Sequence, residues 1–206
     1  MAYEADVLEV MIASPSDVAD EREIVRQIIT EWNVLNSRDK HVVLMPIGWE
    51  THSAPDLSSR PQQLINDRVL AHADLLVGIF WTKLGSPTGK AASGTVEEIE
   101  EHLAKSKPVM LYFSNAPAVP SSINAEQYEK LNEFKRWAYG KGLVQSYDTK
   151  DIFRDDFRRH LSLTASRIIE RDTPDFVQLF EQELGQALSS DAADMLRLQF
   201  RISMAQ

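Results

Sequence analysis

Apolar and polar positions alternate along this chain in blocks that predict strands and helices in turn. Short runs rich in β-branched and aromatic residues predict five strands, at Val7–Ala13, Val42–Ile47, Leu75–Trp81, Lys107–Phe113 and Leu143–Tyr147. Apolar residues at helical spacing predict helices at Val18–Asn36, Pro61–Ala71, Ala125–Tyr139 and Ile152–Glu170, and one more that begins near Ser93 or Thr95. Alternating strands and helices predict an α/β fold with a parallel sheet and right-handed crossovers.

Five parallel strands favour a flavodoxin-like three-layer sandwich with the strand order 2-1-3-4-5. In such a sheet the direction of winding reverses between the first and third strands, and ligands bind at that point, beyond the carboxyl ends of the strands. The loops Ser14–Asp17 and Trp81–Gly94 follow these two strands. We therefore expect the two loops to lie side by side at one crevice.

The pattern changes after Asp172-Thr173-Pro174. Phe176–Leu188 and Ala192–Ile202 have the spacing of two amphipathic helices. We predict an α/β domain over residues 1–172 and a C-terminal helical extension over residues 173–206. The extension either packs on the domain or forms an oligomer or partner surface, and a homo-oligomer is expected.

Composition narrows the class of protein. The net charge is −9, from 22 basic and 31 acidic residues, which opposes direct binding of nucleic acid or of an anionic membrane. There are no cysteines, so thiolate catalysis and cysteine-ligated metals are excluded. No signal peptide or membrane span is visible, and a cytoplasmic protein is expected. The five histidines lack the H-x-x-x-H and H-E-x-x-H spacings, so no metal site is expected.

Ser14, Ser16 and Asp17 are the first candidate ligand-binding residues. Hydroxyls and free N–H groups at a helix N-terminus can bind phosphate or ribose. They can equally form only a turn, with Ser16 as the helix cap. Asp17 would repel a phosphate, which favours a ribose hydroxyl or a purely structural role.

Trp49 and Trp81 both follow strands and can reach the rim of the same crevice. Their rings could stack on a nicotinamide or adenine ring. Each could also be a core aromatic residue at the end of a strand.

Four acids, Glu97, Glu98, Glu100 and Glu101, lie in the predicted helix after the Trp81–Gly94 loop. They could form a solvated helix start, and Thr95–Glu98 also fits a capping box. Ile99 and Leu103 are expected to face the core, so that Glu98 beside Ile99 projects over the strand ends. Partial burial there would raise the pKa of Glu98 and suit it to proton transfer, whereas an ionised Glu98 could stabilise a sugar cation.

These residues carry a family resemblance. The run Ser93-Gly94-Thr95-Val96-Glu97-Glu98-Ile99, followed by Lys107-Pro108-Val109, resembles the G-T-x-x-E motif and K-P-V strand of nucleoside 2-deoxyribosyltransferases. Together with Ala13–Val18, Glu21-Arg22, Gly78–Trp81 and Leu84-Gly85, it also resembles a TIR-like bacterial domain family. The resemblance implies that Glu98 is the catalytic carboxylate. It further implies that Gly85, Ser93 and Thr95 help to bind a nucleotide or nucleoside.

Three functions are consistent with this resemblance. The first is a TIR-type NAD glycohydrolase that cleaves the nicotinamide–ribose bond, with NAD as substrate and no cofactor, inactive until assembled or triggered. The resemblance alone suggests a role for such an enzyme in defence against phage. The second is a nucleoside hydrolase or deoxyribosyltransferase that uses the same Glu98. The third is a catalytically silent assembly module.

Overall fold

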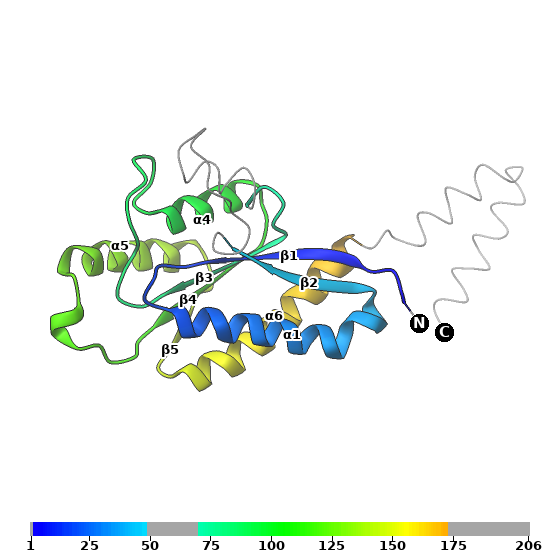
Figure 1. The fold of residues 1–206 in the computed structure, drawn as a ribbon. Coiled ribbons are helices and arrows are strands. Elements are labelled where there is room, and N and C mark those ends of the chain that lie inside the picture. Colours follow the sequence, from blue (N-terminus) through cyan, green and yellow to red (C-terminus); the bar gives the residue numbers. More distant parts are fainter. Residues whose placement is uncertain (1, 49–69, 173–206) are drawn as a thin grey trace, which may run out of the picture. The chain divides into compact units, whose positions relative to one another are not determined.

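The computed structural model describes residues 2–48 and 70–172 (Figure 1). Trp49, most of the predicted helix Pro61–Ala71 and both predicted C-terminal helices lie outside the described residues. The chain divides into two compact units, Met1–Ser162 and Leu163–Gln206. The predicted boundary after residue 172 stays a prediction.

The described elements alternate as the sequence predicts over residues 6–47 and 75–172, and the predicted helix between these two stretches lies mostly outside the described residues. The strands are β1 (Asp6–Ala13), β2 (Val42–Ile47), β3 (Leu75–Phe80), β4 (Val109–Ser114) and β5 (Gln145–Tyr147). The helices are α1 (Ala19–Lys40), α4 (Gly94–Ala104), α5 (Ala125–Lys141) and α6 (Lys150–Asp172), with a short 3-10 turn at Pro120–Ser122. Within the described part of the chain, no helix is both long and apolar enough to cross a bilayer.

All five strands are parallel and their order is 2-1-3-4-5, which confirms the predicted sheet. β1 pairs with β2 from Asp6 opposite Val42, and with β3 from Val10 opposite Leu75. The loops after β1, β3 and β4 therefore leave from the same edge of the sheet, which is where ligands bind in this class of fold.

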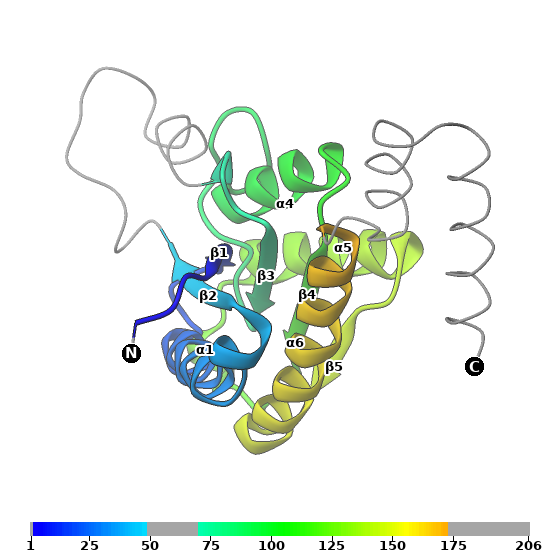
Figure 2. The same ribbon diagram turned by 90° about the vertical axis from the view of Figure 1, so that its right-hand side faces the viewer.

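Helices cover both faces of the sheet. α4 and α5 lie on one face, and α1 and the part of α6 up to Ser162 on the other (Figures 1 and 2). β3 is accordingly apolar along its whole length and buried at every position, as strands covered on both sides are. The three-layer arrangement thus follows from the sequence.

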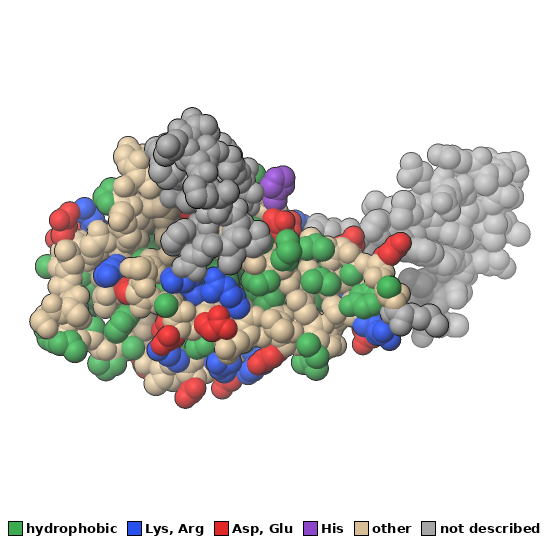
Figure 3. Space-filling view, viewed as in Figure 1, with side chains coloured by type: hydrophobic (Ala, Val, Ile, Leu, Met, Phe, Trp, Pro, Cys, Tyr) green, Lys and Arg blue, Asp and Glu red, His purple; other side chains and the backbone are tan. Residues whose placement is uncertain are grey.

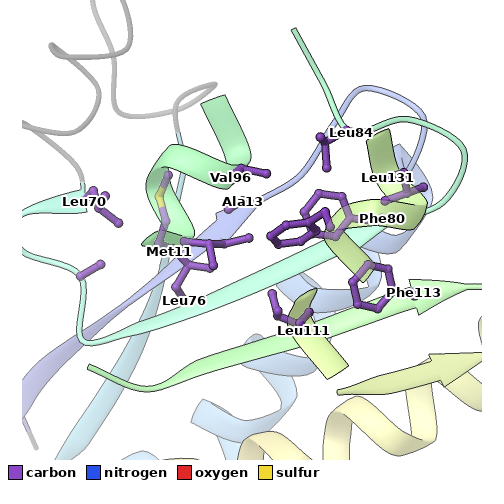
Figure 4. Close-up of a cluster of buried hydrophobic side chains, with 14 of the residues drawn as sticks. Met11, Ala13, Leu70, Leu76, Phe80, Leu84, Val96, Leu111, Phe113 and Leu131 are labelled. Atoms are coloured by element: carbon purple, nitrogen blue, oxygen red, sulfur yellow. The ribbon is translucent and has the colours of Figure 1, made fainter. Parts of the chain in front are cut away.

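The core under α4 and α5 is built around Phe80, which stacks on Phe113 at 5.5 Å between ring centroids (Figure 4). Met11, Leu76, Val96 and Leu131 surround this pair. Gly78 lies in close packing below α4: a Cβ there would lie 2.5 Å from Leu111 Cδ2 and 3.3 Å from Ile99 Cδ1, so these side-chain ends would have to move. The absence of a side chain lets α4 approach the centre of the sheet.

The opposite face has an aromatic core and a charged rim. Phe153 of α6 packs on Tyr112 and on Tyr147, with ring centroids 5.2 and 4.7 Å away. At the surface, Arg158 of α6 binds Glu31 of α1 at 3.0 Å. On the face seen in Figure 3, acidic and basic side chains are interspersed. Such exposed pairs contribute little individually, so the aromatic packing carries most of the stability here.

One predicted core position is wrong. The helical spacing of Leu35 with Ile28 and Trp32 predicts that all three lie on one buried face of α1, yet Leu35 is 76% exposed. Its neighbour Asn33 exchanges two 2.8 Å hydrogen bonds with the backbone of Leu44 in β2. The last turns of α1 therefore present Asn33 to the sheet, and Leu35 faces the solvent.

Candidate functional site

The turn between β1 and α1 is held by Arg22. One Arg22 nitrogen donates to Ser14 Oγ at 3.1 Å and to the Pro15 carbonyl at 2.8 Å. The expected cap at Ser16 is wrong: α1 begins at Ala19, its N-cap residue is Val18, and no side chain caps it. The turn is closed by Arg22 instead, so the Ser14 hydroxyl has a structural partner.

Asp17 links this turn to the end of β3. Its Oδ2 accepts hydrogen bonds from the backbone N–H of Thr82 at 2.9 Å and from the Thr82 hydroxyl at 2.8 Å. Its Oδ1 is buried and makes no hydrogen bond within the described part of the protein. The predicted neighbourhood of the two loops is thereby confirmed, because residues 65 positions apart in the sequence bond directly.

Trp81 is the centre of this edge. Its indole Nε1 donates to the Ala116 carbonyl at 2.9 Å, which ties the end of β3 to the loop after β4. The half-buried ring lines two pockets, one toward α1 and one toward α5. We name them the α1 pocket and the α5 pocket.

The α1 pocket has a volume of about 350 Å³ and an acidic wall. Its lining residues are Ser16, Asp17, Ala19, Asp20, Glu21, Trp81, Ala116, Pro117 and Lys150. Asp20 pairs with Lys150, which lowers the pKa of this exposed carboxyl. Glu21 is 6% exposed and accepts a hydrogen bond from the Tyr147 hydroxyl at 3.3 Å. Burial, and then the Glu21 charge, raise the pKa of Tyr147.

The α5 pocket has a volume of about 280 Å³ and an aromatic and amide wall. It is lined by Trp81, Thr82, Phe113, Ser114, Asn115, Ala116, Ala118, Ile123, Tyr128, Leu131, Asn132 and Lys135. Among its lining residues Lys135 is the single charged side chain. The two pockets on either side of Trp81 therefore differ in charge.

The loop from Trp81 to Ser93 is held against α5. The N–H groups of Leu84 and Gly85 both donate to Gln127 Oε1, at 3.2 and 3.0 Å. Gly85 has a φ of 107°, and a Cβ there would lie 3.2 Å from the Ser93 Cβ. Gly85 is thus required by the backbone conformation and by close packing, independently of any ligand.

α4 begins at Gly94, two residues earlier than a Thr95 cap would require, so of the two predicted caps Ser93 is confirmed. Ser93 is the N-cap, and its hydroxyl accepts from the Val96 N–H at 3.1 Å. Glu98 therefore lies in the second turn, so the capping box proposed for Thr95 and Glu98 is wrong. Thr95 itself is 8% exposed.

The four acids of α4 separate into different environments. Glu97 and Glu98 are 2% and 4% exposed, whereas Glu100 is exposed and Glu101 half-buried. Glu97 accepts a short hydrogen bond from the Thr88 hydroxyl and lies 3.8 Å from Lys90 Nζ. It thereby fastens the loop to α4.

His102 was not among the candidate site residues identified from the sequence. It is fully buried in α4, and neither ring nitrogen makes a hydrogen bond among the described residues. Burial, aided by the charges of Lys107 and Lys105 and opposed by the Pro108 carbonyl, lowers the pKa of His102 to about 4. Leu103 was expected to face the core here, but it is 41% exposed. With Ile99 buried, the next buried position is three residues on, and that residue is His102.

The structure brings the predicted residues together in two groups. Ser16, Asp17 and Trp81 line the α1 pocket. Gly85 packs on Ser93, which caps the helix that carries Thr95 and Glu98. Glu98 lines neither Trp81 pocket. Within the described residues, no cluster of His, Asp and Glu side chains has the geometry to hold a metal ion.

Comparison with known structures finds distant likenesses. A conserved protein from Enterococcus faecalis V583 matches with a TM-score of 0.42 and 15% identity over 75% of this chain and 99% of its own. The apo elongation factor SelB of Methanococcus maripaludis matches with a TM-score of 0.43 and 11% identity, over 79% of this chain and 37% of its own. The flavodiiron protein of Giardia intestinalis matches with a TM-score of 0.40 and 8% identity, over 82% of this chain and 38% of its own.

No curated protein sequence matches the chain significantly. A family model does match, over residues 9–162, from within β1 to the middle of α6 and inside the first compact unit. That model is described as "Domain of unknown function (DUF4062)". Since the match covers well over half of the sequence, the chain belongs to the DUF4062 family.

Proposed function

We propose that this protein is an N-glycosidase that hydrolyses the nicotinamide–ribose bond of NAD, with Glu98 as the catalytic carboxylate. One observation carries the proposal: the Glu98 carboxylate is 4% exposed, one turn into the helix that follows the central strand β3. The resemblance of the Ser93–Ile99 motif to nucleoside 2-deoxyribosyltransferases and TIR domains suggests the reaction, cleavage of an N-glycosidic bond.

The reaction requires stabilisation of one positive charge. When the bond between ribose C1′ and the nicotinamide nitrogen breaks, the electron pair leaves with nicotinamide and positive charge develops on the ribose. An ionised carboxylate in a water-poor environment stabilises that charge strongly. Water then adds to C1′ and releases a proton, which gives ADP-ribose and free nicotinamide. Nicotinamide leaves without protonation, so a second acid is not needed.

The polar neighbours of Glu98 are less suited to this role. Ser93 caps the helix, Glu97 fastens the loop through Thr88 and Lys90, and Glu100 is exposed. We further propose that activity requires assembly of several copies, because unrestrained NAD hydrolysis would harm the cell that makes the enzyme. A role in defence against phage rests on the resemblance to TIR-like domains.

The test compares two isosteric variants of one helix. Concentrated protein is incubated with NAD, and released nicotinamide is measured for wild type, Glu98→Gln and Glu100→Gln. We expect Glu98→Gln to lower the rate by at least about 100-fold. Glu100→Gln should leave the rate unchanged. Thermal unfolding of each variant shows whether the fold is retained.

The same assay separates the alternatives. Equal rates for Glu98→Gln and wild type would overturn the role of Glu98. Base exchange between a deoxynucleoside and a free base, without nicotinamide release, would assign the chain to deoxyribosyl transfer. Absence of turnover on either substrate, even in chemically cross-linked oligomers, would favour a catalytically silent module.

A further inference from the structure

We propose that the α5 pocket is a second small-molecule site, separate from Glu98, for a planar aromatic ring that carries a carboxylate or a phosphate. The pocket lies where the carboxyl ends of β3 and β4 meet the start of α5. Its volume of about 280 Å³ is close to the lower end of the range for small-molecule pockets, roughly 300 Å³, so it suits a ligand group no larger than a single ring system.

The aromatic walls are held in place before any ligand arrives. Trp81 is anchored by its hydrogen bond to the Ala116 carbonyl. Phe113 is fixed by stacking on Phe80 and by Phe134, whose ring centroid is 6.3 Å away. Because these rings cannot collapse into the pocket, a flat apolar ligand gains contact without a cost of ordering the walls.

Lys135 gives the pocket its charge. Its Nζ lies 5.3 Å from the Phe113 ring centroid and donates to Asn115 Oδ1 at 3.3 Å. No carboxylate lies within ion-pair distance of it among the described residues, and no acid lines the pocket. The nearest acid in the network is Asp148, which accepts from the other end of the Asn115 amide at 3.2 Å.

An ammonium group left without a carboxylate is notable in a chain of net charge −9. The charge of Lys135 is held over an aromatic face inside a concavity, where its interaction with an anion is stronger than at an open surface. A ligand anion would complete the pairing that the protein leaves open. This favours an anionic ligand over a neutral one.

Asn132 and Tyr128 supply the remaining specificity. Neither side chain makes a hydrogen bond within the described part of the chain, and both line the pocket. Both also line an adjoining hollow of about 470 Å³, together with Arg136 and Glu129. Tyr128, Asn132 and Arg136 are four residues apart along α5 and share one face. A ligand longer than one ring, such as a nucleotide, can therefore extend from the α5 pocket toward Arg136.

The test uses pairs of ligands that differ only in charge. Benzoate and benzamide probe an aromatic carboxylate, and AMP and adenosine probe a nucleotide. Binding is followed in two-dimensional ¹H–¹⁵N spectra through the Trp81 indole N–H, which is assigned with Trp81→Phe. We expect saturable shifts with at least one anion and about tenfold weaker binding of its neutral partner. Arg136→Met should weaken the binding of AMP and leave the binding of benzoate unchanged.

Variants of α5 decide whether Lys135 is responsible. Lys135→Met should weaken the anion about tenfold, Lys135→Arg should restore most of the binding, and Lys141→Met, on the same helix outside the pocket, should have no effect. The proposal is overturned if neither anion shifts the Trp81 resonance, if charged and neutral partners bind equally, or if Lys135→Met binds as wild type does. Glu98→Gln should bind the anion normally, so a failed NAD assay leaves this result unaffected.

Discussion

The start of α4 and the surroundings of Trp81 use polar residues in opposite ways. In α4, Ser93, Thr95, Glu97, Glu98 and His102 are all buried. Around Trp81, the polar side chains of Ser16, Asp20, Asn115 and Lys135 line pockets that open to solvent. Burial of ionisable groups costs folding free energy, whereas pocket residues remain available to ligands. The comparison implies that changes in α4 alter stability and its pH dependence, and that changes near Trp81 mainly alter binding.

The largest expected effect is the pH dependence caused by His102. Its pKa is about 4 in the folded protein and near 6.5 when unfolded. Between these values the unfolded chain binds more protons, so folding free energy is lost as the pH falls through this window. His102→Leu removes this contribution. Between pH 7 and pH 4 the unfolding free energy of the variant should therefore rise by about 3 kcal/mol relative to that of wild type.

Urea unfolding of both proteins at pH 7, 6, 5 and 4 measures the difference directly. Because all other titrating groups are shared, they cancel in the comparison. His72→Leu, a change at an exposed histidine, should leave the profile unaltered. A constant difference between His102→Leu and wild type at every pH would show that His102 is not the responsible group.

An intermediate effect is expected from Thr88. Thr88→Val removes the hydroxyl that donates to the buried Glu97 carboxylate while keeping the shape of the side chain. The loss of a hydrogen bond to a buried acid should cost about 2 kcal/mol of unfolding free energy. Cleavage in the loop before α4 should also become faster in limited proteolysis.

Ser86→Ala is the matched control for that loop, because the Ser86 side chain is exposed and the backbone carbonyl makes the bond to Gly94. It should resemble wild type in both measurements. If Thr88→Val were as stable as Ser86→Ala, the contrast between the buried α4 site and the open pockets would be weakened.

The smallest expected effect is that of Trp81→Phe on stability. The variant keeps a ring but loses the hydrogen bond to the Ala116 carbonyl, which should cost about 1 kcal/mol. Trp137→Phe offers a comparison, since no hydrogen bond of Trp137 is seen among the described residues and its ring packs on Phe134 at 5.3 Å. Thermal unfolding of the two variants should rank Trp81→Phe as the less stable.

The sheet could be predicted because each strand has a recognisable pattern within its own few residues. Short apolar runs with β-branched residues, separated by helical periodicity, fix five strands, and the winding rules then favour one order. The neighbourhood of the Ser14–Asp17 and Trp81–Gly94 loops followed from that order. These features depend on patterns within a few residues or on general topology.

The roles of individual polar residues could not be predicted in the same way. Ser16 resembles a cap, but Asp17 bonds to Thr82, 65 residues away, and the helix starts later. A cap at Ser93 instead of Thr95 removes Glu98 from the capping position, and His102 is buried where Leu103 was expected. Adjacent residues of a helix point roughly 100° apart, so Ile99 can be buried together with either residue 102 or residue 103, and the sequence pattern does not resolve which of the two faces the core.

The register of β1 has a consequence for synthesis of the protein. β1 is synthesised first. One of its edges pairs with β2, and the other pairs with β3, with Val10 opposite Leu75. A nascent chain can assemble β1, α1 and β2 once residue 47 has emerged, but the other edge of β1 stays unpaired until residue 80. At about 5–20 residues per second this interval lasts on the order of seconds. During it an apolar strand edge is open to other chains, so aggregation during translation should depend on how quickly residues 48 to 80 are produced.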